Sequence, residues 1–135
     1  MSDRLQETSN IWITGASSGI GESVTRALAR GGHRLVITGR RKGALEELAS
    51  VAPDRIIPAA ADTTSKEDLQ AIAWSLENHG DLTMVILNAG TCEYLEIAHY
   101  DSDVIEKNIP PNVIGPARCT ETALPDLARR RAKGE

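Results

Sequence analysis

The stretch Thr14-Gly15-Ala16-Ser17-Ser18-Gly19-Ile20-Gly21 decides how this chain folds, because it sets three glycines between an apolar run and an amphipathic one. The run Asn10 to Thr14 predicts a short strand, and Gly19 to Arg30 predicts a helix. Glycines at such a junction allow a tight turn, close packing of helix on strand, and room for a phosphate at the helix N-terminus. The stretch therefore predicts a strand-turn-helix unit that can hold a phosphate group.

The rest of the chain alternates strands and helices in the same way. Further strands are predicted at Arg34 to Thr38, Arg55 to Ala60 and Leu82 to Leu87, and helices at Lys42 to Ser50, from Ser65 to Gly80, and from Asp101 to about Leu127. Strands separated by helices pair in parallel through right-handed crossovers, so the expected fold is an α/β, doubly wound parallel sheet.

Several positions refine this prediction. Pro58 indicates an edge position for the third strand, because proline lacks the amide that a central strand needs. The continuous apolar run of the fourth strand predicts burial on both faces. In the first helix, the spacing of Ile20, Val24 and Leu28 predicts one buried face. Pro110-Pro111 predicts a break in the last helix, with Ile109 driven out of helical geometry.

A second motif, Leu87-Asn88-Ala89-Gly90, follows the fourth predicted strand. Together with the Gly-x-x-x-Gly-x-Gly spacing after Thr14, it resembles the classical branch of the short-chain dehydrogenase/reductase family. The resemblance covers nearly the whole chain but only the N-terminal half of the family's domain. It implies a truncated Rossmann-type sheet with strand order 3-2-1-4, and a single, partial NAD(P)-binding domain over residues 1–135. A flavodoxin-like or methyltransferase fold is a remote alternative that the glycine spacing disfavours.

The resemblance also implies where a dinucleotide binds. The implied cofactor-binding residues are Gly15, Ser17, Ser18, Gly19, Ile20, Gly21, Arg40, Arg41, Asp62, Thr63, Asn88, Ala89 and Gly90. In the family, the residue matching Asp62 hydrogen-bonds the adenine amino group, with Thr63 beside it. Another interpretation of Asp62 is a cap for the helix that starts near Ser65. The residue matching Asn88 steadies the sheet, and the small residues after it leave space for the adenine-side ribose.

The end of the second strand favours NADP(H) over NAD(H). An NAD site usually carries an acid there to hold the ribose hydroxyls, but the stretch Val36 to Arg41 contains none. Arg40 and Arg41 instead offer two guanidinium groups, which suit a 2′-phosphate. The alternative is that both are surface charges ahead of a helix. One family signal disagrees, because NADP-preferring members often have a basic residue where this chain has Ser18.

The catalytic half of the family pattern is incomplete. Asn112-Val113-Ile114-Gly115 resembles the family's Asn-x-x-Gly element, whose Asn holds a water in a proton relay, so Asn112 is the candidate and Asn108 a weaker one. The family's Tyr and the Lys four residues later are not in this sequence, because its two tyrosines, Tyr94 and Tyr100, are not followed by Lys at that spacing. We therefore expect no catalysis from this chain alone.

Two functions remain open from the sequence. The first is the NADP(H)-binding portion of a short-chain oxidoreductase that reduces carbonyls or oxidises alcohols on an unknown small molecule in its complete form. The second is a non-catalytic nucleotide-binding or interaction module that works through a partner chain. The sequence feature that distinguishes these two functions is the absence of the family's Tyr/Lys pair. A fourth strand left at the sheet edge also predicts self-association, hence a homo-oligomer.

Composition excludes several classes of protein. The 135 residues are 41% hydrophobic and carry a net charge of -4, which argues against a nucleic-acid partner. No apolar run suggests a signal peptide or membrane span, and two cysteines suit a reducing cytoplasm. Cys92 and Cys119 are expected to be buried or half-buried thiols. His33, His79 and His99 show no metal spacing and are expected at the surface.

Overall fold

The computed structural model describes residues 8–132 and shows a four-stranded, fully parallel sheet in the order β3-β2-β1-β4. The strands are β1 (Asn10–Thr14), β2 (Arg34–Thr38), β3 (Ile56–Pro58) and β4 (Met84–Leu87). The predicted strand order and the edge position of the strand with Pro58 are both confirmed. β1 pairs with β2 on one side and with β4 on the other, so the strand order reverses beside β1.

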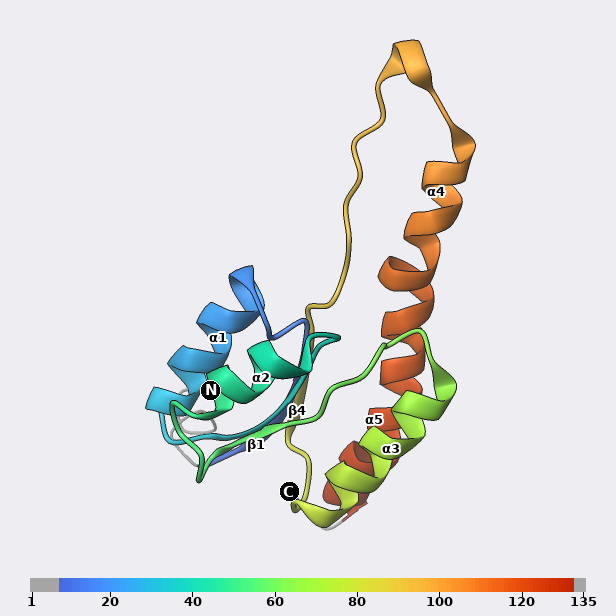
Figure 1. Ribbon diagram of the computed structural model, residues 1–135. Helices are drawn as coiled ribbons and strands as arrows, with labels where there is room; N and C mark the ends of the chain where they lie inside the picture. The colour runs from blue at the N-terminus through green and yellow to red at the C-terminus, as the bar shows by residue number, and fades with distance from the viewer. Residues whose placement is uncertain (1–7, 133–135) are drawn as a thin grey trace.

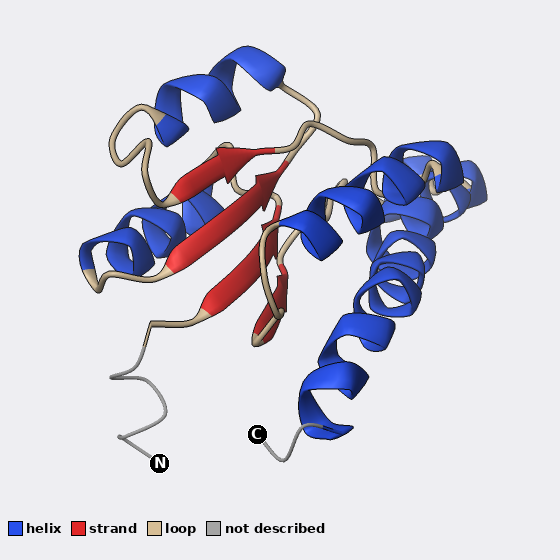
Figure 2. Ribbon diagram, turned by 90° about the horizontal axis from the view of Figure 1, so that it is seen from below, coloured by secondary structure: helices blue, strands red, loops and turns tan. Residues whose placement is uncertain are grey.

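Helices cover both faces of this sheet, as Figures 1 and 2 show. Helices α1 (Gly19–Arg30) and α2 (Lys42–Ala49) lie on one face, and α3 (Lys66–Asn78) and α5 (Gly115–Ala132) lie on the other. Each pair encloses its own apolar cluster, because successive strand residues point to opposite faces. Ile11 and Ile13 enter the α1/α2 cluster, whereas Trp12 enters the α3/α5 cluster.

Trp12 anchors the second cluster and is fully buried. Its indole Nε1 donates to the hydroxyl oxygen of Thr38 at 3.0 Å, so the one polar atom of this large side chain is satisfied inside the core. Because Thr38 ends β2 and Trp12 lies in β1, this bond also ties the two central strands together near their carboxyl ends.

The outer strands differ from their sequence prediction. Both β3 and β4 are shorter than expected, and β4 is not buried on both faces, because its end residues Met84 and Leu87 are 37% and 39% exposed. Within the described residues β4 has a neighbouring strand on one side only, which leaves its other edge uncovered. An apolar run indicates burial in a central strand, but it does not by itself supply the neighbours that complete the burial.

The buried face of the first helix differs from the prediction at its first residue. Ile20 is 75% exposed, whereas Gly21, Thr25 and Ala29 are buried. The buried face is set by Gly21, whose lack of a side chain lets the helix lie directly against the turn that precedes it. Val24 and Leu28 still pack at the margin of the core, so only the first residue of the predicted face is wrong.

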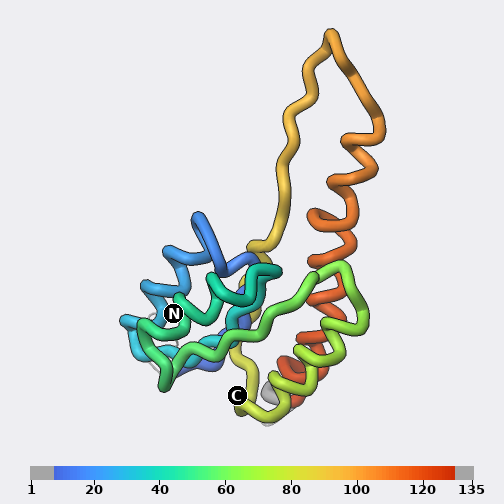
Figure 3. The backbone as a smooth tube through the Cα atoms, viewed as in Figure 1, coloured from blue at the N-terminus to red at the C-terminus, as the bar shows by residue number. Residues whose placement is uncertain are grey.

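After β4 the chain leaves the sheet and returns as a projecting arm, visible in Figures 1 and 3. An irregular segment rises from the end of β4, turns through the short 3₁₀ helix η2 (Ile97–His99) and comes back as α4 (Ser102–Ile109). Every residue from 91 to 103 is exposed. We call residues 91–109 the arm.

The predicted helix break at Pro110-Pro111 is wrong. The chain stays helical through η3, a π-helical turn over Pro110–Ile114 that joins α4 to α5, and Ile109 keeps helical angles of φ −63° and ψ −49°. Proline has no amide hydrogen to donate, and the wider turn is closed further along the chain by a bond from the Gly115 amide to the Pro110 carbonyl. The two prolines are therefore accommodated by a change of helix type rather than by an end of the helix.

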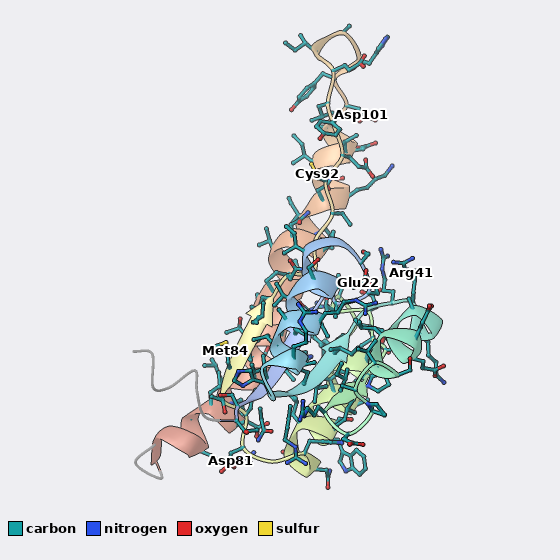
Figure 4. All side chains as sticks on the ribbon, turned by 90° about the vertical axis from the view of Figure 1, so that its left-hand side faces the viewer. Glu22, Arg41, Asp81, Met84, Cys92 and Asp101 are labelled. Carbon is teal, nitrogen blue, oxygen red and sulfur yellow. The ribbon has the colours of Figure 1, made fainter. Side chains whose placement is uncertain are left out.

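Two smaller predictions also need correction. His33 is buried rather than at the surface, and its Nδ1 accepts the amide of Ser9 at 3.2 Å. Cys92 lies exposed on the arm (Figure 4), while Cys119 is buried as expected, and desolvation raises the pKa of its thiol to about 11. In residues 8–132, no helix combines the length and the apolar character needed to cross a membrane.

The close contact at Gly21 gives a stability test. A Cβ on Gly21 would lie 2.0 Å from the carbonyl oxygen of Gly15, so we expect Gly21→Ala to lower the free energy of unfolding by about 3 kcal/mol, the upper end of the usual cost of overpacking. Gly43→Ala in α2 is the matched control, because nothing lies within 4 Å of its Cβ and alanine favours helices by about 1 kcal/mol. Urea unfolding of both variants decides, and equal stabilities would contradict this packing.

Candidate functional site

A cleft of about 740 Å³ opens at the carboxyl end of the sheet, where the loops after all four strands meet. Parallel strands all present their carboxyl ends at one edge, and this is the edge where open α/β sheets bind ligands. Its lining residues are Gly15, Ser17, Ser18, Gly39, Arg40, Arg41, Ala61, Asp62, Thr63, Thr64, Asn88, Ala89, Gly90, Thr91, Glu93, Lys107, Pro110 and Pro111.

The β1–α1 turn forms the base of the cleft. Gly15 adopts a left-handed φ of +67°, and a Cβ there would lie 2.8 Å from the Cα of Ala89. Gly21 stacks on the Gly15 carbonyl from the helix side. Glycine is thus required at both positions, once for backbone conformation and once for close approach, which brings the start of α1 to the edge of the sheet.

Thr14 and Asn88 lock β1 to the loop after β4. The hydroxyl oxygen of Thr14 accepts the amides of both Asn88 and Ala89 at 3.1 Å. In return, the side-chain amide of Asn88 donates to the Gly15 carbonyl at 3.1 Å. These three bonds fix the point where the strand order reverses, so the adjacent cleft is largely pre-formed.

The N-terminus of α1 borders the cleft with its amides available. Ser18 is the N-cap residue, yet its hydroxyl makes no capping hydrogen bond. Both Ser17 and Ser18 line the cleft. The first amides of a helix and the positive end of its dipole attract anions, so this corner can receive a phosphate.

Two positively charged side chains follow the end of β2. Arg40 and Arg41 are exposed and line the cleft, and the Arg41 guanidinium donates to the Ser17 carbonyl at 3.4 Å. Arg41 is therefore held over the β1–α1 turn rather than released into solvent. Figure 4 shows it at the opposite end of the sheet from Asp81.

Asp62 lies on the opposite wall, in the loop between β3 and α3. One of its carboxylate oxygens accepts both the amide and the hydroxyl of Thr64, at 2.9 and 2.7 Å. The hydroxyl bond, then the amide bond and the nearby Arg40 charge, hold the pKa of Asp62 below its usual value. The helix cap is Ser65, whose hydroxyl oxygen accepts the Asp68 amide, so Asp62 is left facing the cleft.

Asn112 lies behind the cleft wall rather than in it. Its side-chain oxygen accepts the Thr91 amide at 3.1 Å, and its side-chain nitrogen donates to the carbonyls of Thr91 at 2.8 Å and Asn108 at 2.9 Å. A Cβ on Gly90 would lie 2.7 Å from that oxygen. Asn112 thus clamps the segment that follows β4.

The cleft gathers most of the predicted site residues and omits a few. Ten of them line it, whereas Gly19, Ile20, Gly21 and Asn112 do not. The sequence prediction missed eight lining residues, namely Gly39, Ala61, Thr64, Thr91, Glu93, Lys107, Pro110 and Pro111. Five of these adjoin predicted positions in the sequence, with Pro111 next to Asn112. Lys107 precedes Pro110 and Pro111 by three and four residues, a helical spacing that could have identified their common face.

No group of three or more potential ligands for a metal ion occurs in the part of the chain that the structure describes.

The carboxylate of Asp62 gives a pH test. Its folded pKa is depressed, so its stabilising contribution is present above the unfolded value of about 3.9 and is lost as the pH falls through the lower folded value. We expect the difference in unfolding free energy between wild type and Asp62→Asn to be constant from pH 5 to 8 and to shrink below pH 4. Thr64→Ala should weaken this acid dependence, because it removes the hydroxyl donor. A difference that does not change with pH would contradict the assignment.

The comparisons with known proteins agree with this geometry. The short chain dehydrogenase family matches residues 9–135. An uncharacterized oxidoreductase of Staphylococcus aureus is 32% identical over 117 residues, covering 85% of this chain and 51% of its own length. An NADP-dependent 3-hydroxy acid dehydrogenase of Shigella flexneri is 30% identical over 122 residues, covering 89% of this chain and 49% of that protein.

Solved structures show the same fold. A 3-ketoacyl-(acyl-carrier-protein) reductase from Brucella melitensis, complexed with NADH, superposes with a TM-score of 0.85 at 26% identity, over 95% of this chain and 53% of that one. A short-chain dehydrogenase from Streptomyces avermitilis gives a TM-score of 0.83 at 29% identity, over 92% and 46%. The chain therefore spans about half the length of the relatives it matches. With the glycine turn, the strand order and the family match in agreement, this chain belongs to the short-chain dehydrogenase/reductase family.

Proposed function

We propose that this chain is the NADP(H)-binding portion of a short-chain oxidoreductase. The observation that carries the proposal is the pair Arg40 and Arg41 at the end of β2, lining a cleft of about 740 Å³ beside the N-terminus of α1. From Val36 to Arg41 there is no carboxylate that would repel a 2′-phosphate. Guanidinium groups bind phosphates through charge-assisted, often bidentate, hydrogen bonds.

The pyrophosphate of the cofactor would lie over the β1–α1 turn, on the side of Arg41 away from the 2′-phosphate. Gly15, Ser17 and Ser18 line that corner, and the uncapped first turn of α1 supplies amides and a positive dipole end. Gly19 and Gly21 shape this turn without lining the cleft, and the side chain of Ile20 between them is exposed. Because Gly21 has no side chain, the start of α1 can lie against the Gly15 carbonyl, which brings the first amides of the helix to this corner of the cleft.

The adenosine half fits between the two loops on the remaining walls. Asp62 offers an ionised carboxylate as an acceptor for the adenine amino group, with Thr63 beside it. Asn88 holds the opposite loop in place, and the small residues Ala89 and Gly90 leave room for the ribose. These roles account for every predicted cofactor residue that lines the cleft.

The relatives differ in the cofactor that their names mention, so they do not determine which cofactor this chain prefers. One relative is named as NADP-dependent, and one related structure is a complex with NADH. Both are similar to this chain over about half of their own length, so neither their substrate nor their cofactor transfers directly. The preference for NADP(H) rests on Arg40 and Arg41.

The chemistry proposed for the complete family form is carbonyl reduction or alcohol oxidation. A bound nicotinamide supplies or takes the hydride. Asn112 is the residue of this chain that we assign to the proton path, by its match to the family's Asn-x-x-Gly element. The family's Tyr-x-x-x-Lys pair does not occur in these 135 residues, so another segment or chain must move the proton at the substrate oxygen.

One observation favours the second function, a nucleotide-binding module that works through a partner chain. The arm carries large apolar side chains in open solvent, with Tyr94 at 94% and Ile97 at 98% exposure. The uncovered edge of β4 adds unpaired backbone groups of the kind that accept another strand. Both surfaces suit association of this chain with another polypeptide.

Titration of NADPH and NADH tests the proposed cofactor. We expect NADPH to bind more tightly than NADH, and Arg40→Ala and Arg41→Ala each to weaken NADPH binding by about 10- to 150-fold, because a charge-assisted contact is lost. The affinity for NADH should change little. Arg34→Ala is the matched control, since this exposed arginine starts β2 at the far end of the sheet. Equal wild-type affinities for the two cofactors would refute the preference.

Activity and association are tested on the isolated 135-residue chain. We expect no NADPH consumption with a panel of ketones and aldehydes, because no Tyr/Lys pair supplies the proton. We expect sedimentation to show oligomers, because the β4 edge and the arm are uncovered. A monomer that reduces a ketone would contradict both expectations.

A further inference from the structure

The double proline of η3 is a feature that the proposed function does not use. Both Pro110 and Pro111 line the cleft, although they lie in the helical segment that carries the arm back to the sheet. Since neither residue has an amide hydrogen, the carbonyls of Glu106 and Lys107 lose the donors that a regular helix would give them. The two prolines therefore remove two helix hydrogen bonds at the wall of the cleft, and the geometry of that wall indicates what the prolines contribute.

The π-helical turn changes the direction of the side chains on either side of it. It contains one residue more per turn than an α-helix, so side chains before the turn are rotated by about 100° relative to those after it. In this orientation Lys107 lines the cleft, and Asn112 reaches the backbone of Thr91 with both ends of its amide. Without the extra residue of the π-helical turn, one of these two side chains would be turned by about 100° from its present direction.

The turn and the first residues of α5, which follow it directly, contact both loops that enclose the cleft. On the β4 side, Asn112 holds Thr91 and packs so close to Gly90 that a Cβ there would lie 2.7 Å from its side-chain oxygen. On the β3 side, a Cβ on Gly115 would lie 3.0 Å from the hydroxyl oxygen of Thr63. Three residues later, the Arg118 guanidinium donates to the Thr64 carbonyl.

We propose that the Pro110–Pro111 turn is a positioning element of the nucleotide cleft, which sets the spacing of the Gly90–Thr91 and Thr63–Thr64 loops and forms the wall for the adenosine half of the ligand. This inference rests on the proposed function, because it assumes that the cleft binds a dinucleotide. The prolines act through Asn112 and Gly115 and through the shape of the wall, and they take no part in proton or hydride transfer.

The test replaces both prolines by alanine. Alanine restores the two amides and has the highest helix propensity, so Pro110→Ala/Pro111→Ala favours a regular α-helix. We expect its melting temperature to equal or exceed that of wild type, while its affinity for adenosine 2′,5′-bisphosphate falls by at least about tenfold, because the cleft wall is displaced. Pro125→Ala is the matched control, an exposed proline inside α5 that does not line the cleft, and it should leave the affinity unchanged.

A second measurement follows the geometry without a ligand. The Thr91 amide donates to Asn112 in the native arrangement, so its hydrogen exchange should accelerate in the double alanine variant and not in Pro125→Ala. Unchanged affinity and unchanged Thr91 exchange in the double variant would overturn this inference alone. A parallel loss of affinity and melting temperature would also overturn it, because that is the signature of a general structural role. Failure of wild type to bind adenosine 2′,5′-bisphosphate would overturn the proposed function and this inference with it.

Discussion

The contact between Gly21 and the Gly15 carbonyl is the constraint on which the rest of the structure depends. With a Cβ excluded at 2.0 Å, α1 lies directly against the turn that leads into it, and the turn lies against Ala89. Thr14 and Asn88 then bind this turn to the end of β4. The strand order, the position of α1 and the shape of the cleft are thus linked through a few atoms at the point where the strand order reverses.

The properties of the cleft follow from that arrangement. The start of α1 brings a positive dipole end to the same edge at which β2 ends in Arg40 and Arg41, while Asp62 is ionised on the facing wall. One end of the cleft is therefore suited to phosphates and the other to a base that donates hydrogen bonds. The family relationship says that such clefts bind dinucleotides, and the local charges of this chain explain our preference for the phosphorylated form.

Two kinds of reasoning carried the successful predictions. The edge position of Pro58 followed from proline chemistry, which acts locally, whereas strand order and most cleft residues followed from the family resemblance that the glycine spacing carries. The exposure of Ile20 was not predictable, because Gly21 sets which face of α1 is buried. The π-helical turn was missed because two prolines allow either a helix end or a wider turn, and the contacts of Asn112 with Thr91 favour the second. Glu93 was missed because it enters the cleft from the irregular part of the arm, whose path no periodicity predicts, whereas the sequence signal for Lys107 is its helical spacing to Pro110 and Pro111.

The central claim is that the cleft at the carboxyl edge is the nucleotide site, and mapping of backbone amide shifts on addition of adenosine 2′,5′-bisphosphate tests it most directly. We expect shifts concentrated at Gly15, Ser18, Arg40, Asp62 and Ala89. A second cavity of about 320 Å³ at the amino edge, lined by Asn10, Arg34 and His79 among others, gives the contrasting outcome. Shifts confined to that cavity, or no shifts at saturating ligand, would contradict the account.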